Sequence, residues 1–330
     1  MGRRGDRREG VERMWSSWQH ATLNGCTDQI MYHFELGGIP MDDAVIVENE
    51  GPVARLVMNR PDKHNALRFD DLDRMVQALH AAEEDDRVRV IVLKGNGPSF
   101  CAGHDYNDAL RSYGLEPEAG CQRPRRPSQR SRLLRDRKLG MNYMAFQNSL
   151  KPVIAQVHGH CTGVGMYLVE LVDLAVCAHD AQFSHAEQRL GLAGNTWHMN
   201  SQILMYGAKK ARELMLLGNS FDGPTAERLG LVNLSVPGEE LESTVHDWAQ
   251  RIAKHPRDAL VTGKAMHQMA LESLGGAAQF SRGYVGHTLG TNLRFESDEF
   301  NILRARSQEG TTATFKQRDQ RFEAPDDQDE

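Results

Sequence analysis

The sequence predicts an α/β fold in which short buried strands alternate with helices. Apolar runs at residues 88–95 and 152–157 have the length and the β-branched content of buried strands. Residues 69–84, which precede both runs, have the spacing of an amphipathic helix, and repeated units of this kind favour an α/β architecture. The apolar residues that share one face of this helix are Leu72, Met75, Val76 and Leu79.

Two further segments precede the middle of the chain. Residues 44–59 are expected to form two short strands joined by a turn at Gly51 and Pro52. Residues 105–140 are polar and carry the run from Arg123 to Arg126, which contains a proline and is followed by another. This composition predicts a loop or lid instead of a part of the core.

The second half of the chain continues the alternation and then changes character. A buried helix is expected over residues 166–172, starting at the glycine-rich residues 163–165. Residues 174–178 and 181–184 have the character of strands. After Ala208 the pattern is mainly helical.

The bulk composition narrows the class of protein. A chain of 330 residues holds one large domain, or one domain with an appendage. No apolar run approaches the roughly 18 residues that cross a membrane, and a net charge of −6 argues against nucleic acid as the main partner. The five scattered cysteines fit free thiols in a reducing compartment better than a disulfide framework, so a cytoplasmic location is expected.

Two glycine-punctuated runs indicate the chemistry. Residues 100–105 are Phe-Cys-Ala-Gly-His-Asp, and residues 157–165 are Val-His-Gly-His-Cys-Thr-Gly-Val-Gly. Each run can turn tightly and direct a bare backbone N–H at a ligand. Two such N–H groups that converge on one oxygen form an oxyanion hole, which stabilises the negative charge that develops on a carbonyl.

Three more segments complete a recognisable pattern. They are LVMNRPDKHNAL at residues 56–67, AQFSHAE followed by LGL at residues 181–192, and GAKKARELMLLG running into AERLGLVN at residues 207–233. With the two glycine runs, they resemble the crotonase (enoyl-CoA hydratase/isomerase) superfamily over most of the chain. The resemblance implies a spiral of ββα units with a C-terminal helical region. It also implies a trimer or a dimer of trimers.

The resemblance also divides the chain. Residues 1–40 are an irregular, Arg-rich extension that lies outside it, and Met41 is a candidate start of the domain. Residues 41–250 are expected to form the ββα spiral core, and residues 251–323 a helical region used in oligomerisation. Residues 324–330 form an acidic tail for which no fixed structure is expected.

The resemblance implies an acyl-CoA thioester substrate that reacts through an enolate. The backbone N–H groups of His104 and Val164 would bind the thioester oxygen, the second one at a helix start where the helix dipole adds to it. Glu187 matches one of the two catalytic glutamates of the family and would be the acid/base. No separate cofactor is implied, since coenzyme A enters as part of the substrate.

Tyr167 departs from the family pattern, because it stands where hydratases of the family carry their second glutamate. Tyrosine has a pKa near 10, so it can orient water or substrate but is a poor base at neutral pH. Glu170, one helical turn further on, is a weaker candidate for a replacement, and packing of Tyr167 in a buried helix is the alternative. Simple hydration is therefore in doubt, whereas one carboxylate suffices to move a double bond.

Other residues are candidates for binding the substrate. Trp197 and His198, with Tyr113 and Tyr143, are candidates for shaping the acyl pocket. Arg318 and the arginines of residues 123–126 are further candidates for the phosphates of coenzyme A. The residues that the resemblance assigns to substrate or coenzyme A binding are Lys63, His64, Ala66, Ala102, Asp105, Tyr106, Asn107 and Lys316.

The expected function is therefore that of an acyl-CoA enzyme of the enoyl-CoA hydratase/isomerase type. The alternatives are a ring-opening or thioester hydrolase on a cyclic acyl-CoA, and a catalytically weak protein that binds CoA esters. A metal site at His158, His160 and Cys161 is not expected, since no partner cluster has the required spacing. The chain also has no complete dinucleotide fingerprint, no P-loop and no Gly-x-Ser-x-Gly motif.

Overall fold

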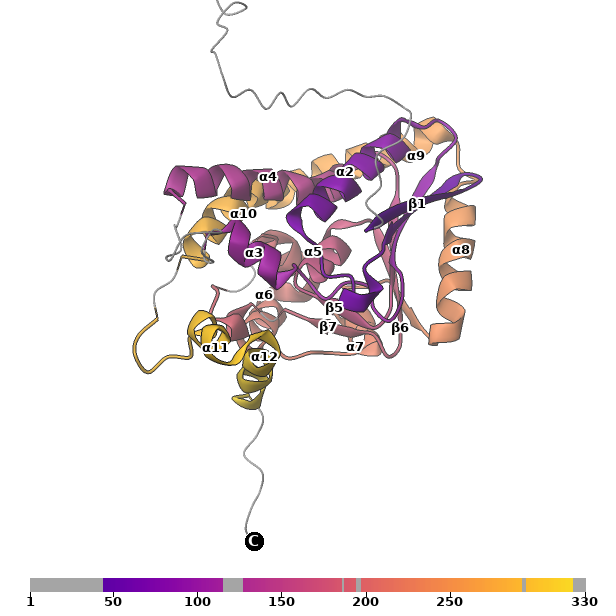
Figure 1. Cartoon of the computed structure of the whole chain (residues 1–330). Helices are drawn as coiled ribbons and strands as arrows, with labels where there is room; N and C mark the ends of the chain where they lie inside the picture. Colours follow the sequence, from indigo (N-terminus) through magenta and orange to yellow (C-terminus); the bar gives the residue numbers. More distant parts are fainter. Residues whose placement is uncertain (1–43, 115–126, 186, 194–196, 293–294, 323–330) are drawn as a thin grey trace, which may run out of the picture. The chain divides into compact units, whose positions relative to one another are not determined.

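A six-stranded sheet organises the part of the chain that the structure describes (Figure 1). The structure is a computed structural model, and it describes residues 44–114, 127–185, 187–193, 197–292 and 295–322. The strand order is β1-β2-β3-β4-β6-β8, with β1 antiparallel to β2 and every other pair parallel. The strands are β1 (Val45–Glu50), β2 (Val53–Met58), β3 (Val90–Gly95), β4 (Val153–Val157), β6 (Leu174–Ala178) and β8 (Leu234–Val236).

Helices pack against the strands of this sheet. Helix α2 (Phe69–Glu84) lies against β1 and β2, and α8 (Leu241–Ile252) lies against β3, β4 and β6. In Figure 1, α8 is on one side of the sheet, and α2 is on the other. Helix α2 begins where the carboxylate of Asp71 accepts the backbone N–H of Arg68, a bond of 2.9 Å that satisfies one donor of the first turn.

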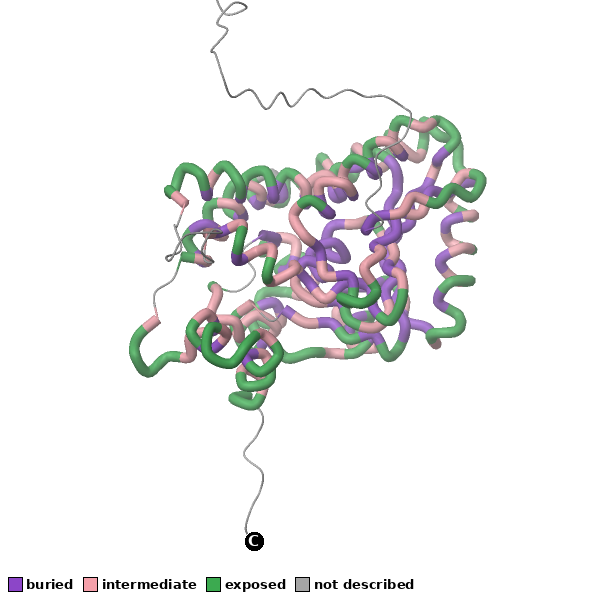
Figure 2. Tube along the Cα trace, viewed as in Figure 1, coloured by how far each residue is buried: buried purple, intermediate pink, exposed green. Residues whose placement is uncertain are grey.

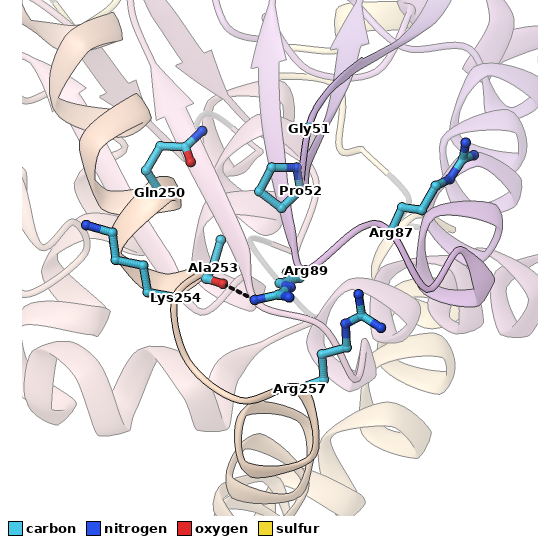
Figure 3. A pocket seen from close by; sticks show the side chains of 8 residues that line it. All are labelled: Gly51, Pro52, Arg87, Arg89, Gln250, Ala253, Lys254 and Arg257. Atoms are coloured by element: carbon cyan, nitrogen blue, oxygen red, sulfur yellow. Dashed lines mark hydrogen bonds between the residues drawn. The ribbon is translucent and has the colours of Figure 1, made fainter.

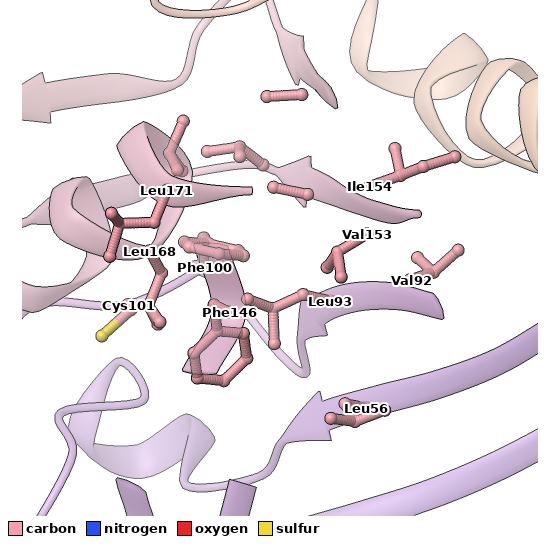
Figure 4. Packing of buried hydrophobic residues seen from close by; sticks show 14 of the residues in the cluster. Leu56, Val92, Leu93, Phe100, Cys101, Phe146, Val153, Ile154, Leu168 and Leu171 are labelled. Atoms are coloured by element: carbon pink, nitrogen blue, oxygen red, sulfur yellow. The ribbon is translucent and has the colours of Figure 1, made fainter. Parts of the chain in front are cut away.

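The hydrophobic core fills the space between the sheet and the helices. Leu56, Leu93, Phe100 and Phe146 are fully buried and belong to one cluster with the apolar face of α2 (Figure 4). Figure 2 shows that the buried part of the trace follows the strands, while the outer helices are mostly exposed. Burial of this apolar surface at about 25 cal/mol per Å² is the main term that holds the strands in place.

A second, smaller sheet leads into the motif loops. Strands β5 (His160–Thr162) and β7 (Gln182–Ser184) pair in parallel, and α5 (Val164–Leu171) follows β5 directly. Every residue of α5 is buried, in keeping with its apolar sequence. The buried helix expected near residues 166–172 is thus confirmed, and it starts slightly earlier.

Helices make up much of the remaining chain. After α6 and α7 the chain forms β8 and α8 and then continues as a helical region. No described helix is both long and apolar enough to cross a bilayer. The remaining helices are α3 (Tyr106–Ser112), α4 (Gln129–Asn148), α6 (Met199–Leu217), α7 (Gly223–Leu229), α9 (Arg257–Leu271), α10 (Ala277–Gly290), α11 (Ile302–Glu309) and α12 (Thr311–Gln320). Short 3-10 turns lie at Pro61–Lys63, Gln188–Leu190 and Gly238–Glu240, and a π-helical turn lies at Glu272–Gly276.

The sequence predicted most of these elements and was wrong about one segment. The hairpin of β1 and β2, helix α2, and strands β3, β4, β6 and β7 are confirmed. The polar segment 105–140 is not a loop throughout, because α3 and much of α4 lie in it. Long Arg, Lys and Leu side chains favour a helix, and Leu139, Tyr143 and Phe146 of α4 are buried although its composition is polar. Helix α6 also starts at Met199, earlier than the helical region was expected.

Candidate active site

The two glycine runs lie side by side. The N–H of Cys101 donates to the carbonyl of His160 at 2.9 Å, and the N–H of Thr162 donates to the carbonyl of Cys101 at 2.9 Å. This parallel bridge pairs Cys101 with Cys161, so His104 and Val164 each lie three residues after the bridge in their own glycine run. Sequence segments about sixty residues apart are thereby brought together in register.

Glycine is required where the two runs approach each other. Gly103 and Gly163 have φ angles of 106° and 53°, which residues with a side chain rarely adopt. A Cβ atom on Gly163 would lie 3.7 Å from the Cα of Gly103 and 3.6 Å from the Oε1 of Glu187. The backbone before each predicted N–H donor therefore passes close to the other run, and Gly163 lies against the predicted acid/base.

The backbone N–H groups of His104 and Val164 are not used by the fold. Neither has a hydrogen-bond acceptor among the residues that the structure describes. Backbone hydrogen bonds on either side of His104 hold its loop. The N–H of Leu67 donates to the carbonyl of Gly103, and the N–H of Asp105 donates to the carbonyl of Leu67, each at 2.8 Å. Val164 is the first residue of α5, where a helix leaves N–H groups free and its dipole favours negative charge.

The His104 side chain supports its loop as a neutral imidazole. Burial lowers the pKa of His104 to about 4, so the ring carries no charge at neutral pH. Its Nδ1 is 3.3 Å from the carbonyl of Leu67 and its Nε2 is 2.7 Å from the hydroxyl of Tyr143. The carbonyl can only accept, so Nδ1 donates to Leu67 and the Tyr143 hydroxyl donates to Nε2.

Glu187 is held by the hydroxyl of Tyr167. The Tyr167 hydroxyl donates to Glu187 Oε1 at 2.5 Å, from the helix that starts at Val164. The other oxygen, Oε2, is buried and has no hydrogen-bond partner among the described residues. One carboxylate oxygen is therefore fixed, and the second is available to a ligand.

Tyr167 remains protonated in this position. Burial, followed by the negative charge of Glu187, raises the pKa of Tyr167 well above 10. A phenol in this state donates a hydrogen bond and does not accept a proton as a base. The two predicted residues are thus brought together, with Tyr167 as the donor and Glu187 as the group able to take a proton.

Glu170 lies one turn beyond Tyr167 on α5 and has its own set of partners. Its side chain is fully buried. Its Oε1 accepts hydrogen bonds from His185 Nε2 at 2.8 Å, Gln202 Nε2 at 3.0 Å and the Tyr206 hydroxyl at 3.0 Å. Because these donors occupy it, Glu170 is not placed as a second free carboxylate beside Glu187.

His185 connects the two glutamates, and sequence reasoning missed it. Its Nε2 contacts Glu170, and its Nδ1 lies 3.7 Å from Glu187 Oε2. A usable signal exists in the sequence: His185 lies two residues after Phe183 at the end of a predicted strand, so the period of two that predicts burial of Phe183 also predicts burial of His185.

An aromatic wall stands next to Tyr167. The ring of Tyr143 lies 5.5 Å from that of Tyr167 and 5.2 Å from that of Trp197, measured between ring centres. His198 lies 5.4 Å from Tyr167 and is 1% exposed, and neither of its ring nitrogens has a hydrogen-bond partner within the part of the chain that the structure describes. These three residues, expected from the sequence to shape an acyl pocket, do gather beside Tyr167 and Glu187.

Tyr113 belongs to a different cluster. Its hydroxyl donates to Asp136 Oδ1 at 2.9 Å and lies 3.0 Å from His287 Nε2. Asp136 also accepts the Thr288 hydroxyl at 2.6 Å. These bonds join α4 to α10, so the role of Tyr113 in the structure is to connect helices.

The residues expected to bind coenzyme A are spread over two regions. Lys63, His64 and Ala66 surround the short turn after β2, where the carbonyl of His64 accepts the N–H of Ala102 at 2.9 Å. The side chain of Lys63 is 61% exposed. Lys316 is an exposed residue of α12.

The remaining expected residues hold the start of α3. Asp105 accepts the N–H groups of Asn107 and Asp108 and forms an ion pair of 2.9 Å with Arg60. The Asn107 side chain accepts from Arg306 at 2.9 Å, and the Tyr106 ring lies 5.4 Å from that of Phe315 on α12. These contacts tie α3 to the C-terminal helices α11 and α12. The arginines of residues 123–126 lie outside the described residues, and Arg318 is paired with Asp319 at 2.8 Å.

A surface cavity of about 650 Å³ lies elsewhere (Figure 3). Its walls come from the turn between β1 and β2, the start of β3 and the segment joining α8 to α9, and Arg89 donates to the carbonyl of Ala253 there at 2.6 Å. It lies where β2 and β3 begin, whereas the motif loops follow the strand ends. No residue of the glycine runs lines this cavity.

Comparison with known proteins identifies the family. The profile of the enoyl-CoA hydratase/isomerase family matches residues 48–282. The chain therefore belongs to this family, and the crotonase-type α/β fold expected from the sequence is confirmed. An enoyl-CoA hydratase/isomerase from Xanthobacter autotrophicus Py2 has a similar structure, with a TM-score of 0.73 and 24% identity over 85% of this chain and 99% of that one.

The names of the relatives refer to several reactions. EchA13 of Mycobacterium tuberculosis, named as an enoyl-CoA hydratase, is 29% identical over 82% of this chain and 90% of its own length. A peroxisomal Δ(3,5)-Δ(2,4)-dienoyl-CoA isomerase of Arabidopsis thaliana is 33% identical over 56% of this chain and 65% of its own. A hydroxycinnamoyl-CoA hydratase-lyase of Pseudomonas fluorescens is 28% identical over 68% and 76%. The family alone thus does not fix the reaction.

Proposed function

We propose that the protein is an acyl-CoA enzyme that forms a thioester enolate and moves a proton with a single carboxylate, Glu187. The observation that carries this proposal is the set of groups left free at one place. The unused N–H groups belong to His104 and Val164, the residues that directly follow the two close glycines, and Glu187 lies against the second of these glycines. Glu187 also keeps one oxygen that has no hydrogen-bond partner among the described residues.

The mechanism follows from these groups. The thioester oxygen accepts hydrogen bonds from the two N–H groups, which stabilises the negative charge as it develops. Glu187 takes a proton from the carbon next to the carbonyl or its vinylogous position, the electron pair moves onto the thioester oxygen, and Glu187 returns the proton at another carbon. Tyr167 donates to Glu187 throughout, so the second oxygen carries the proton.

One carboxylate favours a double-bond shift over simple hydration. Hydration with two carboxylates holds the attacking water between them, and the position of the second one is occupied by a protonated phenol. A double-bond shift needs only one group that removes and returns a proton. Ring opening or thioester hydrolysis by a directed water is the second candidate, since Tyr167 is a donor that can orient water.

The test compares two substrates with one variant. We expect the purified protein to convert a 3-enoyl-CoA into the conjugated 2-enoyl-CoA faster than it hydrates crotonyl-CoA, both followed by absorbance of the enoyl thioester. Glu187→Gln should abolish turnover but retain binding of the CoA ester in calorimetry. Binding without turnover by the wild-type protein on both substrates would contradict an isomerase, and would leave a hydrolase or a CoA-ester-binding protein.

We also infer that the chain assembles with copies of itself, as a trimer or a dimer of trimers. Large apolar side chains are exposed on outer helices, including Met266 and Met269 of α9 at 65% and 67% and Leu216 of α6 at 58%. Exposed apolar surface of this kind is typical of an interface. Light scattering after size exclusion tests the inference, and a monomer at micromolar concentration would contradict it.

Lys63 and Lys316 are proposed as contacts for the phosphates of coenzyme A. Lys316 has no ion-pair partner among the described residues, and Lys63 has only a distant one, Asp62, at 3.9 Å. Replacing either with alanine should raise KM for a CoA ester several-fold. The matched control is the pantetheine ester of the same acyl group, which lacks the nucleotide phosphates, and its KM should not change.

A further inference from the structure

A chain of buried polar groups runs inward from the candidate acid/base. Glu187 Oε2 lies 3.7 Å from His185 Nδ1, and His185 Nε2 lies 2.8 Å from Glu170 Oε1. The His185 and Glu170 side chains are 3% and 0% exposed, and that of Glu187 is 14% exposed. One imidazole therefore separates two carboxylates, one at the reacting position and one inside the protein.

Neighbouring side chains fix the ring of His185. The Tyr167 ring stacks on it with a centre-to-centre distance of 5.8 Å and an angle of 27° between planes. Gln202 and Tyr206, from α6, donate to the same Glu170 carboxylate that His185 contacts. Tyr167 and Glu170 both come from α5, so one rigid helix sets the positions of the histidine and of both glutamates.

The protonation of His185 follows from what each nitrogen faces. Nε2 lies 2.8 Å from Glu170 Oε1 and 3.1 Å from the Gln202 amide nitrogen, and an N–H on Nε2 directed at Glu170 Oε1 fits the shorter of these contacts. Nδ1 faces the carboxylate of Glu187, and both Nδ1 and Glu187 Oε2 are buried without any other partner. A bare lone pair on Nδ1 would repel that oxygen, whereas an N–H attracts it. An N–H on each nitrogen fits both contacts, and a ring with both protons carries a positive charge.

The charges around His185 agree with this protonation. Burial alone would lower the pKa of His185, but the nearby charge and hydrogen bond of Glu170, helped by Glu187, outweigh it and raise the pKa above 6.5. The other titratable groups that face the ring are Tyr167, Tyr206 and His198. Tyr167 and Tyr206 stay neutral because burial raises the pKa of each phenol, and His198 stays neutral because burial lowers its pKa to about 4.

We propose that His185 is a positioning residue: its imidazolium, clamped by Glu170, holds the Glu187 carboxylate for proton transfer where the second catalytic glutamate is missing. This proposal rests on the proposed function of Glu187. The histidine does not exchange a proton with substrate. Its charge balances that of Glu187 in a buried site and attracts Oε2 from 3.7 Å, a distance too long for a hydrogen bond, while the hydroxyl of Tyr167 holds Oε1.

The proposal predicts a pH effect on catalysis. Since the charged histidine is required, kcat/KM should fall as the pH rises through the pKa of His185. In His185→Gln this alkaline limb should disappear and kcat should fall about tenfold or more, with KM for the CoA ester little changed. In Glu170→Gln the limb should move to lower pH, because the main group that raises the histidine pKa has lost its charge.

Tyr206→Phe is the matched control for Glu170→Gln. It removes one hydrogen bond from the same Oε1 but leaves both carboxylate charges and His185 in place. Its alkaline limb should stay close to that of the wild-type protein. An equal shift in both variants would mean that general loosening of the region moves the limb, and would overturn the proposal.

A titration that needs no turnover separates this proposal from the proposed function. NMR of ¹³C-labelled histidine in the full-length protein should show His185 titrating above pH 6.5, with assignment from His185→Gln or, if that variant is unstable, from the signal shifted in Glu170→Gln. Glu187→Gln should lower the titration midpoint, and Glu170→Gln should lower it further. A midpoint at or below 6.5 in the wild-type protein, or one that Glu187→Gln leaves unchanged, would overturn the proposal. Absence of turnover on any CoA ester would overturn the proposed function and the positioning role of His185 that rests on it. A titration midpoint above 6.5 that Glu187→Gln lowers would then show that the charged contact exists without catalysis.

Discussion

Glu187 and Glu170 contact opposite nitrogens of the same histidine, yet their surroundings differ. Glu170 is fully buried and accepts hydrogen bonds from three side chains. Glu187 accepts one, from Tyr167, and keeps a buried oxygen without a partner. A carboxylate whose hydrogen bonds are complete stabilises the structure, whereas an incompletely bonded one retains capacity for a ligand or a proton.

The largest expected effect is on activity at the Glu187 end. Glu187→Gln removes the one carboxylate at the site that keeps a free oxygen among the described residues, but it retains an acceptor for Tyr167, so turnover should fall by about 10²–10⁴-fold. Its free energy of unfolding should fall by only about 1–2 kcal/mol, since the acceptor for Tyr167 is kept and the loss is that of the charge facing His185 at 3.7 Å. Steady-state kinetics and urea denaturation on the same preparation measure both. A large loss of stability would show that Glu187 is structural too.

The reverse pattern is expected at the Glu170 end. Glu170→Gln places an amide N–H₂ among donors that need an acceptor, so unfolding free energy should fall by about 3 kcal/mol. Urea denaturation of Glu170→Gln and of the wild-type protein measures this difference. Glu170→Gln that unfolds within about 1 kcal/mol of the wild-type protein would contradict the structural role argued for this carboxylate.

The sequence allowed the Glu187 end to be predicted but not the Glu170 end. Glu187, Tyr167 and the N–H groups of His104 and Val164 lie within contiguous motifs, so local order along the chain was sufficient. Glu170 and His185 matter because Gln202 and Tyr206 reach them from α6, and contacts between distant segments have no local signature. Position on α5 alone made Glu170 a weak replacement for the second glutamate, and its partners make it a support for His185.

The elements of the fold were predictable where their own residues carry a local pattern. The prediction was wrong where burial depends on contacts with other elements. Apolar periodicity located β3, β4 and α2, because the apolar residues of each element predict which of its faces is buried. Helix α4 has a polar, Arg-rich composition, and its burial depends on α2 and α10 packing around it. Asp136 and Arg132 are buried there through partners on other elements, which no pattern within α4 reveals.

Removing the hydroxyl of Tyr167 should have a smaller effect on both properties. Tyr167→Phe leaves Glu187 without its only donor but with His185 still beside it, so kcat should fall about tenfold, the equivalent of 1.4 kcal/mol. Unfolding free energy should change by about 1 kcal/mol, typical of one hydrogen bond. A variant with wild-type kcat would show that Tyr167 serves only for packing in α5. Tyr143→Phe, which removes a buried hydroxyl from the same wall, is the comparison variant.

The smallest expected effect is the dependence of stability on pH, and its sign distinguishes His185 from the other buried histidines. The folded pKa of His185 lies above 6.5, so its contribution is complete below pH 6.5 and is lost as the pH rises through the folded pKa. His104 and His198 have folded pKa values of about 4, so the protein loses stability as the pH falls from 6.5 toward 4. Stability against urea should therefore peak near pH 6.5.

Two variants separate the sides of that maximum. Glu170→Gln should flatten the alkaline side, because His185 then gains little from folding in its charged form. His198→Phe should flatten the acid side, because a ring that cannot be protonated does not resist folding at low pH. If the free energy of unfolding instead rises steadily through pH 8, His185 is neutral in the folded protein, and the two glutamates are not joined by a charged histidine.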